Sequence, residues 1–75
     1  MPSLREWRRR RLLTQQELAK AVGVRRYQTI HRWESGEAHP QPSKQRRLCE
    51  VLRITPDELL AALEETAAER KGLAA

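Results

Sequence analysis

The chain has 75 residues, enough for one small domain whose core is marginal in size. It carries 15 Lys and Arg against 10 Asp and Glu, and its single cysteine excludes a disulfide framework or a cysteine-rich zinc site. No apolar run approaches the roughly 20 residues of a membrane-spanning helix, and the basic N-terminus lacks the apolar stretch of a signal peptide. These features predict one domain in the reducing environment of the cytoplasm.

Charge is distributed unevenly along the chain. Residues 1–36 contain nine Lys and Arg against three Glu, a net charge of +6, whereas residues 54–75 contain two against five acidic residues, a net charge of −3. A basic front and an acidic tail predict a polyanionic partner for the first half only. A solvated arginine-rich surface without a partner is the alternative that composition leaves open.

The first two predicted helices begin at capping boxes, in which a Ser or Thr is followed three residues later by Glu. SLRE (residues 3–6) and TQQE (14–17) both fit this pattern. The hydroxyl accepts an N–H of the first turn while the Glu reaches back. Gly23 follows the apolar period of the second helix, at the place where a left-handed residue ends many helices. The sequence therefore predicts helices at about 3–12 and 15–22.

Three further helices are predicted after Gly23. Gly36 ends the third, and the segment EAHPQP that follows must be a loop, because two closely spaced prolines interrupt a helix. The fifth begins at a third capping box, TPDE, with Pro56 at its first helical position. These signals predict helices at about 26–35, 42–53 and 56–70.

The predicted fold class is all-α, because no alternating run of β-branched residues is present. We expect one domain over residues 1–68 and a C-terminal tail over 69–75 that frays. Apolar residues at helical spacing predict the core: Leu4, Trp7, Leu18, Ala19, Val22, Ile30, Trp33, Leu48, Val51, Leu52, Leu59 and Leu63.

The second and third helices are short and joined by a tight turn around Gly23 and Val24, which predicts a helix-turn-helix. In the third, Ile30 and Trp33 point inward at i, i+3. The opposite face carries polar side chains, of which glutamine suits bidentate contact with adenine and arginine with guanine. These outward side chains are Tyr27, Gln28, His31 and Arg32.

Three segments together, LTQQELAKAVGV, TIHRWESG and LCEVLRITPDELL, resemble the Cro/phage-repressor (XRE-like, Cro/C1-type) helix-turn-helix family. The resemblance covers about residues 4–63. It implies a compact five-helix, lambda-repressor-like DNA-binding fold with a central helix-turn-helix. The helix at about 26–35 would enter the DNA major groove, and the starts of neighbouring helices would hold phosphates.

The resemblance also implies roles for individual residues. It gives base-reading positions, phosphate contacts, and an ion pair between the first and third helices that links Arg8 to Glu34. The base-reading positions are Tyr27, Gln28 and Arg32, and the phosphate contacts are Gln15 and Ser35. From their places on the third helix and near the loop after Gly36, we expect further phosphate contacts from His31, His39 and Lys44.

One departure from the family lies between Gly23 and Ile30, where this chain has one extra residue. The usual Ser or Thr cap of the third helix is replaced by Arg25 and Arg26, which have no side-chain acceptor. Either the turn is longer or the helix starts a residue earlier. Our hypothesis is that both arginines meet phosphates at the groove edge and that DNA partly orders the turn.

The most favoured function is that of a sequence-specific, repressor-type transcription regulator, associated with the nucleoid in the cytoplasm and without a cofactor or metal. An enzyme is disfavoured because no nucleophile, base and orienting group come together. The apolar stripe of the last helix is a candidate homodimer seam, or it simply closes the core. The alternative function is an antitoxin-like or adaptor module that binds protein and touches DNA only non-specifically. The candidate seam residues are Leu60, Leu63 and Ala67.

Overall fold

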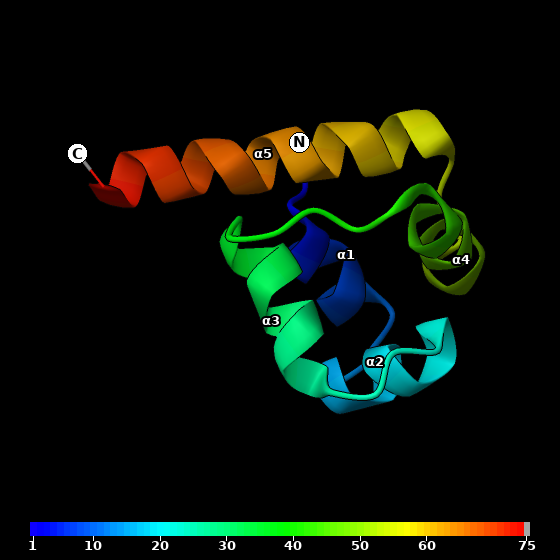
Figure 1. The fold of residues 1–75 in the computed structure, drawn as a ribbon. Coiled ribbons are helices and arrows are strands. Elements are labelled where there is room, and N and C mark those ends of the chain that lie inside the picture. The colour runs from blue at the N-terminus through cyan, green and yellow to red at the C-terminus, as the bar shows by residue number, and fades with distance from the viewer. Residues whose placement is uncertain (75) are drawn as a thin grey trace.

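Five helices make up the part of the chain that the computed structural model describes, residues 1–74, with side chains described to Arg70. In Figure 1 α5 crosses one side of the molecule, α2 lies on the opposite side, and α4 is seen nearly end-on. The all-α, five-helix fold is thereby confirmed. The helices are α1 Leu4–Arg10, α2 Gln15–Val22, α3 Tyr27–Ser35, α4 Pro42–Leu52 and α5 Pro56–Ala74.

Two of the three predicted capping boxes form completely. At the start of α2 the Thr14 hydroxyl accepts the Glu17 N–H at 3.0 Å, and the Glu17 carboxylate accepts the Thr14 N–H at 2.9 Å. The TPDE segment makes the same pair of bonds at the start of α5. In α1 only the Ser3 hydroxyl accepts from the Glu6 N–H, at 3.3 Å, and the Glu6 carboxylate meets that hydroxyl instead of the backbone.

The predicted stop signals of α2 and α3 are also confirmed. Gly23 and Gly36 each follow the last helical residue with a φ of 82°, in the left-handed region that glycine adopts without strain. A Cβ on Gly36 would also lie 3.1 Å from the Arg70 side chain, which packs over this turn. Glycine at residue 36 is therefore favoured by the backbone conformation, and a larger side chain would also need the Arg70 side chain to shift.

The first helix ends earlier than the sequence indicates. It was expected to reach residue 12, but α1 ends at Arg10 because Leu12 turns into the left-handed region with a φ of 59°. A backbone hydrogen bond closes this turn against the end of α1, because the Leu13 N–H donates to the Arg8 carbonyl at 3.2 Å. No glycine marks this turn, so residue types alone do not predict it.

Helices α3 and α5 also differ from the expected bounds. The third helix begins at Tyr27, one residue late, because Arg26 is extended and supplies no side-chain cap. The extra residue therefore lengthens the turn. Helix α5 continues to Ala74. The fraying expected for residues 69–75 stays a prediction, and residue 75 lies outside the described residues.

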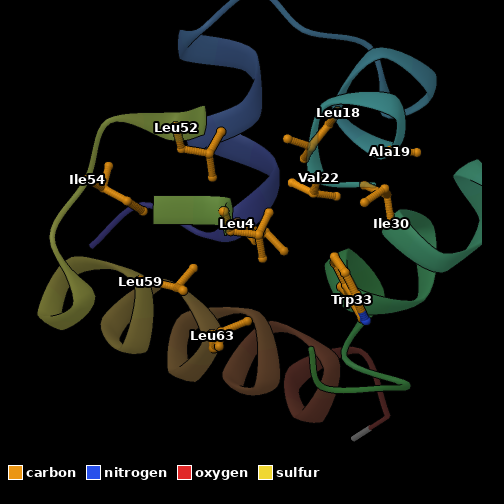
Figure 2. Packing of buried hydrophobic residues seen from close by; sticks show 11 residues of the cluster. Leu4, Leu18, Ala19, Val22, Ile30, Trp33, Leu52, Ile54, Leu59 and Leu63 are labelled. Atoms are coloured by element: carbon orange, nitrogen blue, oxygen red, sulfur yellow. The ribbon is translucent and has the colours of Figure 1, made fainter. Parts of the chain in front are cut away.

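The core lies between α5 and the other four helices (Figure 2). Ten of the twelve predicted core residues are buried, whereas Trp7 and Val51 are half-buried at its edge. Ile54 and Ala62 are buried as well, although neither was among the predicted core residues. Within residues 1–74 no helix combines the length and the apolar character needed to cross a bilayer.

Candidate nucleic-acid interface

Helix α3 separates its inner and outer faces sharply. Ile30 and Trp33 are buried and anchor the helix to the core. On the other side the Tyr27 side chain is 47% exposed, and Gln28 and Arg32 are exposed as well. This is the division that helical spacing predicted, and it presents a phenol, an amide and a guanidinium on one surface.

A buried ion pair fixes α3 against α1. The Arg8 Nε lies 2.5 Å from Glu34 Oε2, and the Arg8 Nη2 donates to Glu34 Oε1 at 3.2 Å. The remaining Arg8 nitrogen donates to the Leu13 carbonyl at 2.8 Å, and the Gln15 amide donates to Glu34 Oε1 at 3.1 Å. The structure thus joins the two residues that the resemblance paired, while their contribution to stability stays a prediction.

The turn between α2 and α3 runs from Gly23 to Arg26 and carries two exposed arginines, Arg25 and Arg26. Helix α3 has no side-chain cap and no acidic residue in its first turn. Its positive N-terminal end is therefore unneutralised by the protein. This end, with both arginines beside it, is chemically suited to an anion.

Three of the expected phosphate contacts lie together. Gln15, His31 and Ser35 line one open hollow of about 550 Å³, formed where α1, α2, α3 and α5 meet. His31 is exposed, and the Ser35 hydroxyl donates to the Arg32 carbonyl at 3.1 Å. The side chain of Gln15 is held by Glu34. Of the three, His31 thus presents the most open side chain.

Two other expected contacts lie elsewhere. The Lys44 ammonium sits 3.4 Å from both the Val22 and Gly23 carbonyls, so it caps the end of α2. His39 lines a separate hollow beside α5, next to Leu60. The structure therefore does not bring Lys44 and His39 to the group formed by Gln15, His31 and Ser35.

Several basic side chains bind the carbonyl ends of helices, which carry partial negative charge. Arg11 donates to the Leu52 carbonyl at 2.6 Å, at the end of α4. Arg47 donates to the Ala21 carbonyl at 3.3 Å, at the end of α2. Arg70 donates to the Ser35 carbonyl at 3.3 Å, at the end of α3. Sequence reasoning missed these partners because a backbone carbonyl carries no residue-specific signal.

The candidate dimer seam is only partly at the surface. Leu63 is 5% exposed and belongs to the core, whereas Leu60 is 51% exposed and Ala67 is half-buried. Hollows of about 280 and 240 Å³ adjoin Leu60. The apolar surface that α5 offers to another molecule is therefore centred on Leu60.

Two titratable groups are shifted by their surroundings. The backbone N–H of Thr14, followed by its hydroxyl, lowers the pKa of the Glu17 carboxyl. Desolvation, followed by the nearby charge of Glu50, raises the pKa of the Cys49 thiol and makes it a weaker nucleophile. In the described part of the chain no three metal-ligating side chains gather into a site.

The chain matches the helix-turn-helix family HTH_3 over residues 4–59, a stretch that begins in α1 and ends in α5. No curated protein and no solved structure matches it significantly. The family match spans the buried ion pair, the turn and the exposed face of α3. The chain therefore belongs to the Cro/C1-type (XRE) helix-turn-helix family, whose domain binds DNA and is typical of transcription regulators.

Proposed function

We propose that the protein is a sequence-specific, repressor-type transcription regulator that inserts α3 into the DNA major groove. The observation that carries this proposal is the outer face of α3. Tyr27, Gln28 and Arg32 are exposed there on a helix that Ile30 and Trp33 hold against the core. Because the helix is fixed before binding, little ordering of its backbone opposes the formation of base contacts.

The chemistry of this face suggests what it reads. The Gln28 amide can donate and accept in one bidentate contact with adenine, and the Arg32 guanidinium can donate twice to guanine. The Tyr27 ring can pack on a thymine methyl group. We therefore expect an adenine and a guanine a few base pairs apart in each half-site, with each correct pair worth about 1–3 kcal/mol of discrimination.

Phosphate contacts would set the register of α3 on the duplex. We assign one group of contacts to Gln15, His31 and Ser35, which line one hollow. A second group consists of Arg25 and Arg26 at the other end of α3. Such contacts release counterions, so binding should weaken steeply as salt rises.

Repression would follow from steric occupancy of a promoter by a homodimer. Leu60 and Ala67 on α5 supply the apolar surface for a two-fold contact between copies. A symmetric dimer presents two copies of α3 to half-sites about one DNA turn, roughly 34–36 Å, apart. The operator is then expected to be an inverted repeat.

The test is selection of bound DNA from a random-sequence pool at near-physiological salt, followed by sequencing. An enriched inverted repeat supports both base reading and the dimer, and a single enriched half-site supports base reading by a monomer. The Gln28→Ala variant is the matched control, because it should relax the sequence at one position only. A pool that shows no enrichment contradicts the proposed function.

A protein-binding module is the second candidate, favoured by Leu60, which is exposed between two hollows. In that case the affinity resides in an apolar hot spot, and binding to the partner depends weakly on salt. Replacing Leu60 with Glu separates the two functions. The variant should bind a single DNA half-site normally if α3 reads DNA, and should lose its protein partner if the module reading is right.

A further inference from the structure

A basic hollow lies over the lengthened turn between α2 and α3. Its volume is about 370 Å³, and it is distinct from the hollow that contains Gln15 and Ser35. Three cations and no carboxylate line it. The polar side chains around it are Gln16 and Lys20 from α2, Arg25 and Arg26 from the turn, and Tyr27 and Gln28 from α3.

The three cations of this hollow have no partner within the described part of the chain. Lys20, Arg25 and Arg26 are all exposed, and none makes a side-chain hydrogen bond or ion pair there. Lys44 and Arg47, which belong to α4, instead donate to backbone carbonyls at the end of α2. Three like charges around one hollow repel one another, and a bound anion would relieve this repulsion.

The position of the hollow relates it to the major groove. The turn joins α2 to the N-terminal end of α3 (Figure 1). Ser35 is the last residue of α3 and therefore lies at its C-terminal end. A nine-residue helix is about 13.5 Å long, close to the roughly 12 Å width of the major groove. When α3 is in the groove, the two ends of the helix can therefore approach the two opposite edges of the groove.

We propose that this hollow binds neighbouring backbone phosphates of one DNA strand, with Lys20 and Gln16 as contacts in addition to Arg25 and Arg26, and that each of its three cations meets its own phosphate. These phosphates lie across the groove from the one held near Gln15 and Ser35. The turn supplies both arginines of this hollow, and α2 and α3 supply its other polar side chains. This inference rests on the proposed function, since it requires α3 to enter the groove.

The experiment compares Lys20→Gln with Arg9→Gln on a mixed-sequence DNA duplex, measuring the dissociation constant over a range of salt concentrations. Both residues are exposed and each change removes one positive charge, but Arg9 lies on α1 outside the hollow. We expect Lys20→Gln to reduce the slope of log K against log salt by about 0.9, which corresponds to about fivefold weaker binding near 0.15 M. Arg9→Gln should leave the slope unchanged, and Lys20→Arg should restore it. Equal thermal unfolding of the variants establishes that they are folded.

Ethylation of individual phosphates on the selected operator then locates the contact. The wild type should show interference at both edges of the groove, and Lys20→Gln should lose it at one edge while selecting the same sequence. An unchanged salt slope, or an equal loss in Arg9→Gln, overturns the inference even when the operator is enriched. A random-sequence pool that shows no enrichment contradicts the proposed function. The salt slope on the mixed-sequence duplex still decides whether the hollow contacts phosphate. A poly-glutamate peptide serves as a second probe. If Lys20→Gln binds this peptide more weakly than the wild type does, with no change in the salt slope for DNA, the hollow binds an acidic protein segment instead.

Discussion

Two runs of arginine, residues 8–11 and 25–26, have the same chemistry and different surroundings. In the first run Arg8 is buried against Glu34, and Arg11 donates to carbonyls at the end of α4. In the second run both side chains are exposed and make no side-chain hydrogen bond or ion pair within residues 1–70. Two arginines of the first run therefore hold helices together, and the second run keeps its charge available to a partner.

The difference arises from acceptors, not from charge. A guanidinium has five N–H donors, and burial is tolerated only where carboxylates or carbonyls satisfy them. The bend after α1 brings the Glu34 carboxylate and the Leu13 carbonyl to Arg8. The turn before α3 offers no such acceptor to Arg25 or Arg26. Net charge alone thus overstates how much of a basic chain can meet a polyanion.

Removal of Arg8 should have the largest effect on stability. Arg8→Ala leaves the Glu34 carboxylate, whose side chain is 4% exposed, without its cation, and the Leu13 carbonyl loses a donor. We expect the free energy of unfolding to fall by about 3 kcal/mol. Thermal unfolding followed by circular dichroism measures this, with Arg9→Ala as control. An unchanged melting temperature would mean that the pair contributes nothing.

Replacement of both Arg25 and Arg26 with alanine should weaken DNA binding without affecting the fold. The salt slope should fall by about 1.8, and affinity near 0.15 M by about 30-fold, on every DNA sequence alike. Titrations of an operator and of an unrelated duplex measure this. If the loss is confined to the operator, these arginines read bases and the contrast between the two runs must be revised.

Arg11 should contribute less than Arg8, because its side chain is exposed and its acceptors are neutral carbonyls instead of a carboxylate. Arg11→Ala removes its bonds to the Leu52 and Arg53 carbonyls and its position 5.9 Å from the Trp7 ring. We expect a loss of about 1.5 kcal/mol in the free energy of unfolding. Urea denaturation provides the value, and an unaltered salt slope for DNA distinguishes Arg11 from the second run. A stability equal to the wild type would contradict this assignment.

Leu12, directly after the first run, should respond in the opposite direction. It is 89% exposed and adopts a left-handed φ of 59°. Leu12→Gly removes the steric cost of this conformation, and the larger backbone freedom of unfolded glycine offsets part of the gain. We expect a net stabilisation of about 0.5–1 kcal/mol in urea denaturation, with Leu12→Ala as control. A decrease in stability would show that the leucine side chain contributes more than its exposure indicates.

Acid should affect the start of α2 slightly, between the two runs. The folded state lowers the pKa of Glu17, so its contribution is fully present above the ordinary carboxyl pKa and is lost as pH falls through the lowered value. The Glu17→Gln variant should therefore lose less stability than the wild type as pH falls. At higher pH the variant should be less stable than the wild type by a constant amount. Melting temperatures from pH 7 to pH 3 test this. Curves that are parallel throughout would exclude a role for the Glu17 charge.

The helix bounds that could be predicted are those with local chemical signals. The Thr14 and Thr55 boxes and the glycines at 23 and 36 act within a few residues of themselves, so their effects are readable from the sequence. The end of α1 was missed because Leu12 adopts a glycine-like conformation without being glycine. The start of α3 was placed one residue early because Arg26 gives no capping signal.

The candidate site divides in the same way. Helical spacing was sufficient to find the outer face of α3 and to place Ile30 and Trp33 inside. It could not show that Lys44 caps α2, or that Lys20 faces the same hollow as Arg25, because both depend on how separate helices meet. Tertiary proximity of side chains to backbone carbonyls leaves no trace in residue spacing.

The ion pair beneath α3 has a consequence for protein engineering. Because Glu34, Ile30 and Trp33 carry the attachment of the helix, the outward positions form an exchangeable cassette. A combinatorial library at Tyr27, Gln28 and Arg32 would vary the DNA sequence that the protein recognises while its scaffold stays constant. New specificities could then be screened without repacking the domain for each variant.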